Sequence, residues 1–124
     1  MRLKTMFMLA AVLFLIWGLI LFFPDMILNT LGTGIIPTNN EVYLARAISS
    51  LLLGMAVLAW MARNVGPSQA RNAIVVCFVF SNALAAAVNI IGLLGGAVPQ
   101  AAWGGVVVNG LLALGFALTG RQAK

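Results

Sequence analysis

The sequence has no histidine, one cysteine and only two acidic residues. Without histidine it cannot form a bis-histidine haem site, a histidine-ligated zinc site, or a Ser-His or Cys-His nucleophile pair. Cys77 has no second cysteine to pair with, and its apolar neighbours indicate a small lipid-facing or core residue. Asp25 and Glu41 have no further acid to orient them as a catalytic pair. These absences predict a protein that is not an enzyme and that holds no metal or cofactor.

Polar residues are also scarce. Of 124 residues, 63% are hydrophobic and 7% are charged, and the mean hydropathy is +1.10. So few polar side chains cannot cover the surface of a soluble domain. A membrane-spanning helix needs about 20 apolar residues, so four such helices would use most of the chain. The composition therefore predicts an all-α, multi-pass integral membrane protein with a single transmembrane domain over residues 1–124.

The first apolar run extends from Thr5 to Phe23 and follows Arg2 and Lys4. It is longer than the hydrophobic region of a signal peptide, which has about 7 to 15 residues, so we expect a retained first span over residues 5–23. Residues 24–31 begin with proline and are followed by Gly32, which is typical of a short helix. Because this segment is short and partly apolar, we expect it to lie at the membrane interface.

The second long apolar run is preceded by a helix-start signal. Thr38 and Glu41 have the spacing of a capping box, in which each residue caps the other's backbone N–H. This predicts a helix that begins near Asn39 and a second span over about residues 42–62.

The remaining two spans are bounded by turn residues. Ser68 is a candidate N-cap for a third span over about residues 72–94. Pro99 is expected to open the fourth helix, whose span covers about residues 101–120. Because every connection is short, the four spans should pack as antiparallel neighbours in one four-helix bundle.

Basic residues are distributed unevenly between the connections. Six of the seven Lys and Arg lie in the terminal segments or between the second and third spans: Arg2, Lys4, Arg63, Arg71, Arg121 and Lys124. The connections on the opposite side contain none. The positive-inside rule therefore predicts that both termini and the connection between the second and third spans are cytoplasmic. The net charge of +5 is explained by this topology, and the basic residues are too scattered to indicate nucleic-acid binding.

Arg46 is the exception because it lies inside the second span, where a charge must be paired or must reach water. In one interpretation its side chain extends outward to headgroups or to the surface acids. In the other it faces the bundle interior and binds an anion or a partner. Ser49, Ser50 and Gly54 follow at i+3, i+4 and i+8, so they share a helical face with Arg46.

The third and fourth spans contain three asparagines that add to this polar set. Asn82 and Asn89 are seven residues apart, hence on one helical face, and Asn109 is near the middle of the fourth span. One hypothesis is that these amides form hydrogen bonds between helices. The other is an outward-facing pocket for a carboxylate or phosphate, with Arg46, Ser50, Asn82, Asn89 and Asn109 as ligand-binding residues.

Several segments resemble a class of small bacterial four-span membrane proteins of unknown function. They are Phe22-Phe23-Pro24-Asp25, Leu44-Ala45-Arg46-Ala47, Leu51-Leu52-Leu53-Gly54-Met55, Trp60-Met61-Ala62-Arg63, Arg71, Asn82 and Leu111-Leu112-Ala113-Leu114-Gly115-Phe116-Ala117. The resemblance covers most of the chain and implies a bacterial inner-membrane protein in which Arg46 and Asn82 fall on recurring positions. It implies no activity, ligand or partner.

Together these features predict an interaction, accessory or structural membrane protein. Its Gly, Ala, Ser and Asn faces would pack within the bundle and against a membrane protein partner or a second copy of the chain, with the lipid bilayer as solvent. The alternative is a small binding or transport protein with an outward-facing polar pocket around Arg46. Transport coupled to protons or sodium usually requires an acid at membrane depth, and both acids lie at the predicted surface.

Overall fold

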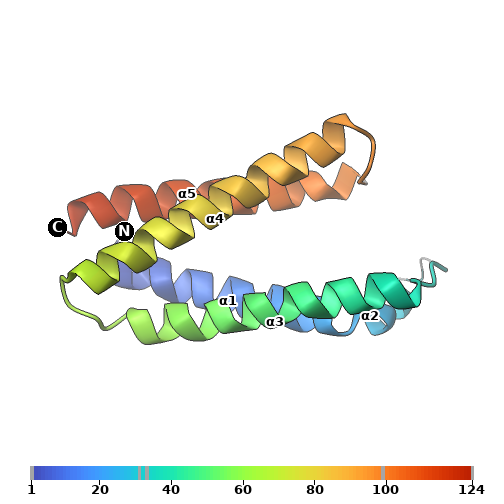
Figure 1. Ribbon diagram of the computed structural model, residues 1–124, viewed down its shortest axis with the longest axis horizontal. Coiled ribbons are helices and arrows are strands. Elements are labelled where there is room, and N and C mark those ends of the chain that lie inside the picture. The colour runs from blue at the N-terminus through green and yellow to red at the C-terminus, as the bar shows by residue number, and fades with distance from the viewer. Residues whose placement is uncertain (1, 31, 33, 99, 124) are drawn as a thin grey trace. The chain divides into compact units, whose positions relative to one another are not determined.

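The computed structural model describes residues 2–30, 32, 34–98 and 100–123 (Figure 1). Its elements are helices: α1 (Leu3–Phe22), α2 (Pro24–Thr30), α3 (Asn39–Ala62), α4 (Gln69–Leu94), the 3-10 helix η1 (Gln100–Ala102) and α5 (Trp103–Gln122). Helices α1, α3, α4 and α5 are long and apolar enough to cross a membrane. The predicted all-α class is thus confirmed for the part of the chain that the structure describes.

The described chain divides into two compact units. One unit, Phe7–Met61, contains most of α1 together with α2 and nearly all of α3. The other unit combines the first residues of α1 with the chain from Ala62 onward, which contains α4, η1 and α5. In the first unit α1 contacts α3, and in the second α4 contacts α5. The packing of all four long helices in one bundle stays a prediction.

The starts of α3 and α4 follow local side-chain chemistry. The Thr38 backbone N–H donates to Glu41 Oε2 at 2.6 Å, and the Glu41 N–H donates to Thr38 Oγ1 at 3.3 Å. This confirms the predicted capping box and the helix start at Asn39. Ser68 is the N-cap of α4, and its side chain accepts a hydrogen bond from the Arg71 N–H. The predicted Ser68 cap is also confirmed.

Helix α2 begins at Pro24, as the sequence predicts, and none of its residues is buried. The chain that follows contains Gly32 and Gly34 at φ angles of +64° and +67°. Only glycine adopts this left-handed conformation without strain, so these two positions allow the chain to turn toward α3. The predicted end of the helix at Leu31 lies outside the described residues.

The fourth long helix starts with a tighter turn than the sequence indicates. Residues of η1 (Gln100–Ala102) form a single 3-10 turn that leads directly into α5 (Trp103–Gln122). The Trp103 Nε1–H donates to Gln100 Oε1 at 3.1 Å and so connects the two segments. Pro99, the expected opening residue, and Lys124, one of the predicted cytoplasmic basic residues, lie outside the described part of the chain.

In the first unit α1 and α3 lie alongside each other (Figure 1). Ser49 is completely buried, and its hydroxyl donates to the Gly18 carbonyl at 2.5 Å. A Cβ at Gly18 would lie 2.7 Å from Leu53 Cδ2, which is far below van der Waals contact. Gly18 therefore allows the two helices to approach closely, as small residues do in membrane helix pairs.

In the second unit the start of α4 contacts the end of α5, and the end of α4 contacts the start of α5. Four contacts along the pair show this order: Arg71 with Ala123, Val75 with Gly120, Phe78 with Phe116, and Asn89 with Gly105. The rings of Phe78 and Phe116 are stacked with centroids 5.1 Å apart, and both side chains are fully buried. This aromatic pair forms the centre of the unit's core.

The first turns of α1 pack against the end of α5. Leu3 and Met6 are buried, and a Cβ at Gly115 would lie 2.9 Å from Met6 Sδ. Gly115 thus provides the space that the flexible methionine side chain occupies. The start of α1 and the last turns of α5 consequently belong to the same packed unit.

Much of the apolar surface points outward. Only 17–33% of the most apolar 18-residue window of each long helix is buried. Large apolar side chains such as Leu51, Ile91 and Leu94 are at least 70% exposed. Such extensive apolar exposure is unfavourable in water and is the normal state of a helix surrounded by lipid.

Candidate functional site

Arg46 lies beside the end of α1. Its Nε–H donates to the Phe22 carbonyl at 3.2 Å, and its guanidinium carbon lies 5.8 Å from the centre of the Phe22 ring. Phe22 is the last residue of α1, and the last carbonyls of a helix have no partner within the helix. Arg46 therefore caps the neighbouring helix and makes a cation–π contact with its final side chain.

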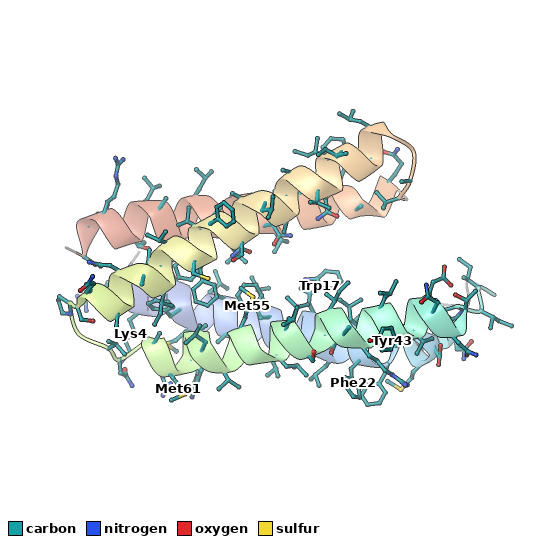
Figure 2. All side chains as sticks on the ribbon, in the orientation of Figure 1. Lys4, Trp17, Phe22, Tyr43, Met55 and Met61 are labelled. Carbon is teal, nitrogen blue, oxygen red and sulfur yellow. The ribbon has the colours of Figure 1, made fainter. Side chains whose placement is uncertain are left out.

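The Arg46 side chain is exposed. Figure 2 shows Phe22 toward the same end of the unit as Tyr43, which precedes Arg46 by one turn. Neither Asp25 nor Glu41, both of which the structure describes, forms an ion pair with this arginine. Cap formation thus provides a third role for Arg46, beside the two that the sequence suggested.

The small residues that follow Arg46 on α3 do not all point the same way: one faces α1 and two are exposed. Ser49 at i+3 points to α1 and bonds to Gly18. Ser50 at i+4 is exposed, and its hydroxyl donates to the Ala47 carbonyl of its own helix at 2.7 Å. Gly54 is exposed, with no atom within 4 Å of a Cβ built on it. Ser50 and Gly54 therefore leave an uncovered small-residue surface on α3.

Two of the three predicted asparagines bond within their own helices. Asn82 is 2% exposed, and its Nδ2 donates to the Phe78 carbonyl at 2.8 Å. Asn109 Nδ2 donates to the Gly105 carbonyl at 2.8 Å. Each side-chain Nδ2 thus donates to a backbone carbonyl one turn earlier in the same helix. This hydrogen bond requires neither a ligand nor a second helix.

Asn89 behaves differently from the other two asparagines. Its side-chain nitrogen would lie 3.2 Å from a Cβ at Gly105, so its amide packs closely against α5. Asn89 and Asn109 thus both lie next to Gly105, whereas Asn82 lies about two turns nearer the start of α4. Arg46 and Ser50 belong to the other unit. A pocket that combines all five residues stays a prediction.

The sequence analysis assigned Arg71 to the cytoplasmic flank and missed its role in packing. Arg71 is 8% exposed, and its Nη2 donates at 2.7 Å to the carbonyl of Ala123, the C-cap of α5. Its Nε has no hydrogen-bond partner in the structure. The available signal was spacing, since Arg71, Val75, Phe78 and Asn82 follow one another at i, i+4, i+7 and i+11 and share the buried face of α4.

Each unit therefore contains an arginine that caps the carbonyl end of a neighbouring helix. Arg46 caps α1, and Arg71 caps α5. A guanidinium is suited to this position because it carries five donors and a positive charge, which the negative end of a helix attracts. The same donors also bind carboxylates and phosphates. Within the described ranges no group of three potential metal-ligating side chains comes together.

An apolar groove of about 400 Å³ lies along α1 and α3 in the first unit. The residues that line it are Ala11, Val12, Leu15, Leu53, Ala56, Val57 and Trp60. Its only polar side-chain group is the Trp60 indole N–H. The groove can therefore hold hydrocarbon but has no group for catalysis or for recognition of a charged ligand.

Comparisons with known protein families, with curated proteins and with solved structures find no match to this chain.

Proposed function

We propose that this chain is a multi-pass protein of a bacterial inner membrane that acts as a non-enzymatic interaction or accessory subunit. Four helices of sufficient length and apolarity, with most of their surface outward, support membrane insertion. The uneven distribution of basic residues supports a topology with both termini in the cytoplasm. In this topology the four helices pack as antiparallel neighbours, and α2 lies at the outer interface.

The uncovered surface at Ser50 and Gly54 carries the proposal of an interaction role. The two residues are four apart on α3 and share a face. Pairs of small residues at this spacing allow two membrane helices to approach closely. The Leu53 side chain already packs against Gly18, whereas a Cβ at Gly54 would have no atom within 4 Å. The surface therefore has the character of a helix-binding face, and its partner is a membrane protein or a second copy of the chain.

The test combines membrane extraction with a bulky substitution. We expect the protein to remain in membranes washed with alkaline carbonate, because its helices are embedded in hydrocarbon. Gly54→Leu should reduce recovery of the crosslinked partner or dimer about tenfold, since the helices can no longer approach. Ala83→Leu, at an exposed position of α4, is the matched control and should leave recovery unchanged. Equal recovery from both variants would refute the interaction face, and release by carbonate would refute membrane insertion.

The second candidate function is binding or transport of a small molecule through an outward-facing polar pocket around Arg46. One observation favours it: the exposed Arg46 guanidinium uses its Nε–H on the Phe22 carbonyl and has further donors, which can bind a carboxylate or phosphate. Arg46→Ala should abolish binding of such a ligand, and Arg46→Lys should restore it only in part. Unchanged ligand binding by Arg46→Ala would refute the pocket.

A further inference from the structure

A groove of about 230 Å³ lies between the start of α4 and the end of α5, within one packed unit. The residues that line it are Asn72, Val75, Val76 and Val79 from α4, and Ala117, Gly120 and Arg121 from α5. All of them except Asn72 and Arg121 lack a polar side-chain group. A Cβ at Gly120 would lie 2.7 Å from Val75 Cγ1, so the two helices are in close contact where the groove lies.

The two polar residues lie at the same end of this groove. On α4, which begins at Gln69, Asn72 precedes the lining valines, so the wall changes from polar to apolar along the helix. On α5 the order is reversed, and Arg121 in the last turn follows Ala117 and Gly120. The start of α4 contacts the end of α5, so both helices place their polar group at one end. The groove therefore has a polar end and an apolar length.

The proposed topology places the polar end of the groove at the cytoplasmic surface of the membrane. Helix α4 runs outward from this surface, so Val79 lies about 10 Å beyond Asn72 along the helix axis. Asn72 and Arg121 are thus at the level of the lipid headgroups, and the apolar wall is at the level of the acyl chains. A phospholipid of the inner leaflet has the same order of groups, with its phosphate at the surface and its hydrocarbon inward.

The charge at the polar end is complementary to an anion. Arg121 is exposed, and both acids of the chain, Asp25 and Glu41, belong to the other unit, Phe7–Met61. No acidic side chain of its own unit can therefore pair with this guanidinium. Asn72 is also exposed and offers amide donors to the same groove. A guanidinium together with an amide matches the oxygens of a phosphate.

The apolar length of the groove is suited to hydrocarbon. Val76 is 65% exposed, and Val79 and Ala117 are half-buried, so this wall is open along its length. Water would find no hydrogen-bond partner on the wall. An acyl chain between two helices is contacted from more than one side, so it gains more dispersion contacts there than on the convex face of a single helix.

We propose that this groove binds one anionic phospholipid of the inner leaflet. The guanidinium of Arg121 holds the phosphate, and the Asn72 amide donates to one of its oxygens. One acyl chain lies along the wall that Val76, Val79 and Ala117 form. The inference rests on the proposed membrane insertion and orientation of the chain. A lipid bound in this way contacts both helices and stabilises the packing of α4 against α5.

The first measurement is the lipid affinity of the full chain purified in a neutral detergent. Short-chain phosphatidylglycerol should bind about tenfold more tightly than phosphatidylcholine of the same chain length, because choline offsets the phosphate charge. Arg121→Ala should weaken phosphatidylglycerol binding about tenfold, and Asn72→Ala, which changes no charge, about fivefold. Arg2→Ala is the matched control, because Arg2 is an exposed arginine outside the groove lining, and it should leave the affinity nearly unchanged.

The second measurement changes the apolar wall and leaves the charge unchanged. Ala117→Leu fills the groove and should weaken phosphatidylglycerol binding about tenfold. Ala87→Leu, at an exposed position of α4 outside the groove, is the matched control and should leave binding nearly unchanged. The unfolding temperature without lipid shows whether Ala117→Leu still packs normally. If it does not, Val76→Ser at the exposed wall position takes its place and should weaken binding about threefold.

Several results would overturn the site or its ligand. Equal affinity for the two lipids would exclude a headgroup preference, and equal losses in Arg121→Ala and Arg2→Ala would indicate diffuse attraction instead of a site. Unchanged binding by the wall variants would exclude the groove. Competition by glycerol phosphate at the concentration of the lipid would assign the site to a soluble phosphate compound. Failure of this test leaves the carbonate extraction result unaffected, so it is distinguishable from failure of the proposed membrane function.

Discussion

At the scale of single residues, the two arginines that cap helix ends differ in how visible they are in the sequence. Arg46 is conspicuous because it interrupts an apolar run. Arg71 follows a polar turn and resembles an ordinary flanking residue, yet it is the more buried of the two. A charged residue with apolar sequence neighbours can be recognised as unusual from the sequence. Whether its side chain is buried depends on which helix packs against it.

Replacement of Arg46 tests the cap that it forms on α1. Arg46→Ala should lower the free energy of unfolding by about 1 kcal/mol, because the Phe22 carbonyl loses its donor. Arg46→Lys should recover part of this loss, since lysine retains the charge but has no Nε–H and no planar face for the ring. Chemical unfolding in detergent micelles measures both changes. Ser50→Ala, which removes only a hydrogen bond within α3, is the control, and an Arg46→Ala protein as stable as wild type would contradict the cap.

At the scale of helices, close approach depends on a few glycines whose neighbours are in contact. Gly18, Gly115 and Gly120 each have a side chain within 3 Å of where a Cβ would be, whereas Gly54 and Gly110 have open space. The sequence shows all of these residues as equivalent small positions in apolar runs. The distinction between contact and open surface requires the opposing helix.

The Gly120 contact predicts a rescuable loss of stability. A Cβ at Gly120 would lie 2.7 Å from Val75 Cγ1, so Gly120→Ala should destabilise the protein by about 1–3 kcal/mol. Val75→Ala should make the double variant more stable than the sum of the two single effects, because it vacates the space. Gly110→Ala, on the same helix in open space, should stabilise by up to about 1 kcal/mol. Strictly additive effects in thermal unfolding would argue against this contact.

The local starts of the helices could be predicted because their chemistry lies within a few residues. Thr38 with Glu41, and Ser68 with the Arg71 N–H, form caps at the expected positions. Which side chain of a polar face turns inward could not be predicted in the same way. Ser49 and Ser50 differ by about 100° around α3, and only the position of α1 determines that Ser49 is the buried one.

At the scale of the whole molecule, the proposed orientation in the membrane follows from charge alone. A single cysteine at the turn between α3 and α4, Gly66→Cys in a Cys77→Ala background, should react with an impermeant thiol reagent only from the cytoplasmic side. Asn40→Cys, in the first turn of α3, should react only from the opposite side. If the impermeant reagent labels the residue 66 variant in intact cells, the protein has the opposite orientation to the one proposed.

The sequence by itself determined the class of the chain, its helical segments and the sites of two helix caps. Composition, apolar periodicity and capping chemistry depend on residues that are near each other in the chain. Only the tertiary structure decided that Arg46 and Arg71 cap neighbouring helices, that Asn82 and Asn109 bond to their own backbones, and which glycines receive a partner side chain. The two arginine caps and the glycine contacts join residues far apart in sequence, which helix packing brings together and local pattern does not encode. The two asparagine bonds span only four residues, but the choice between a bond to the preceding turn and a bond to another helix depends on what lies opposite the amide.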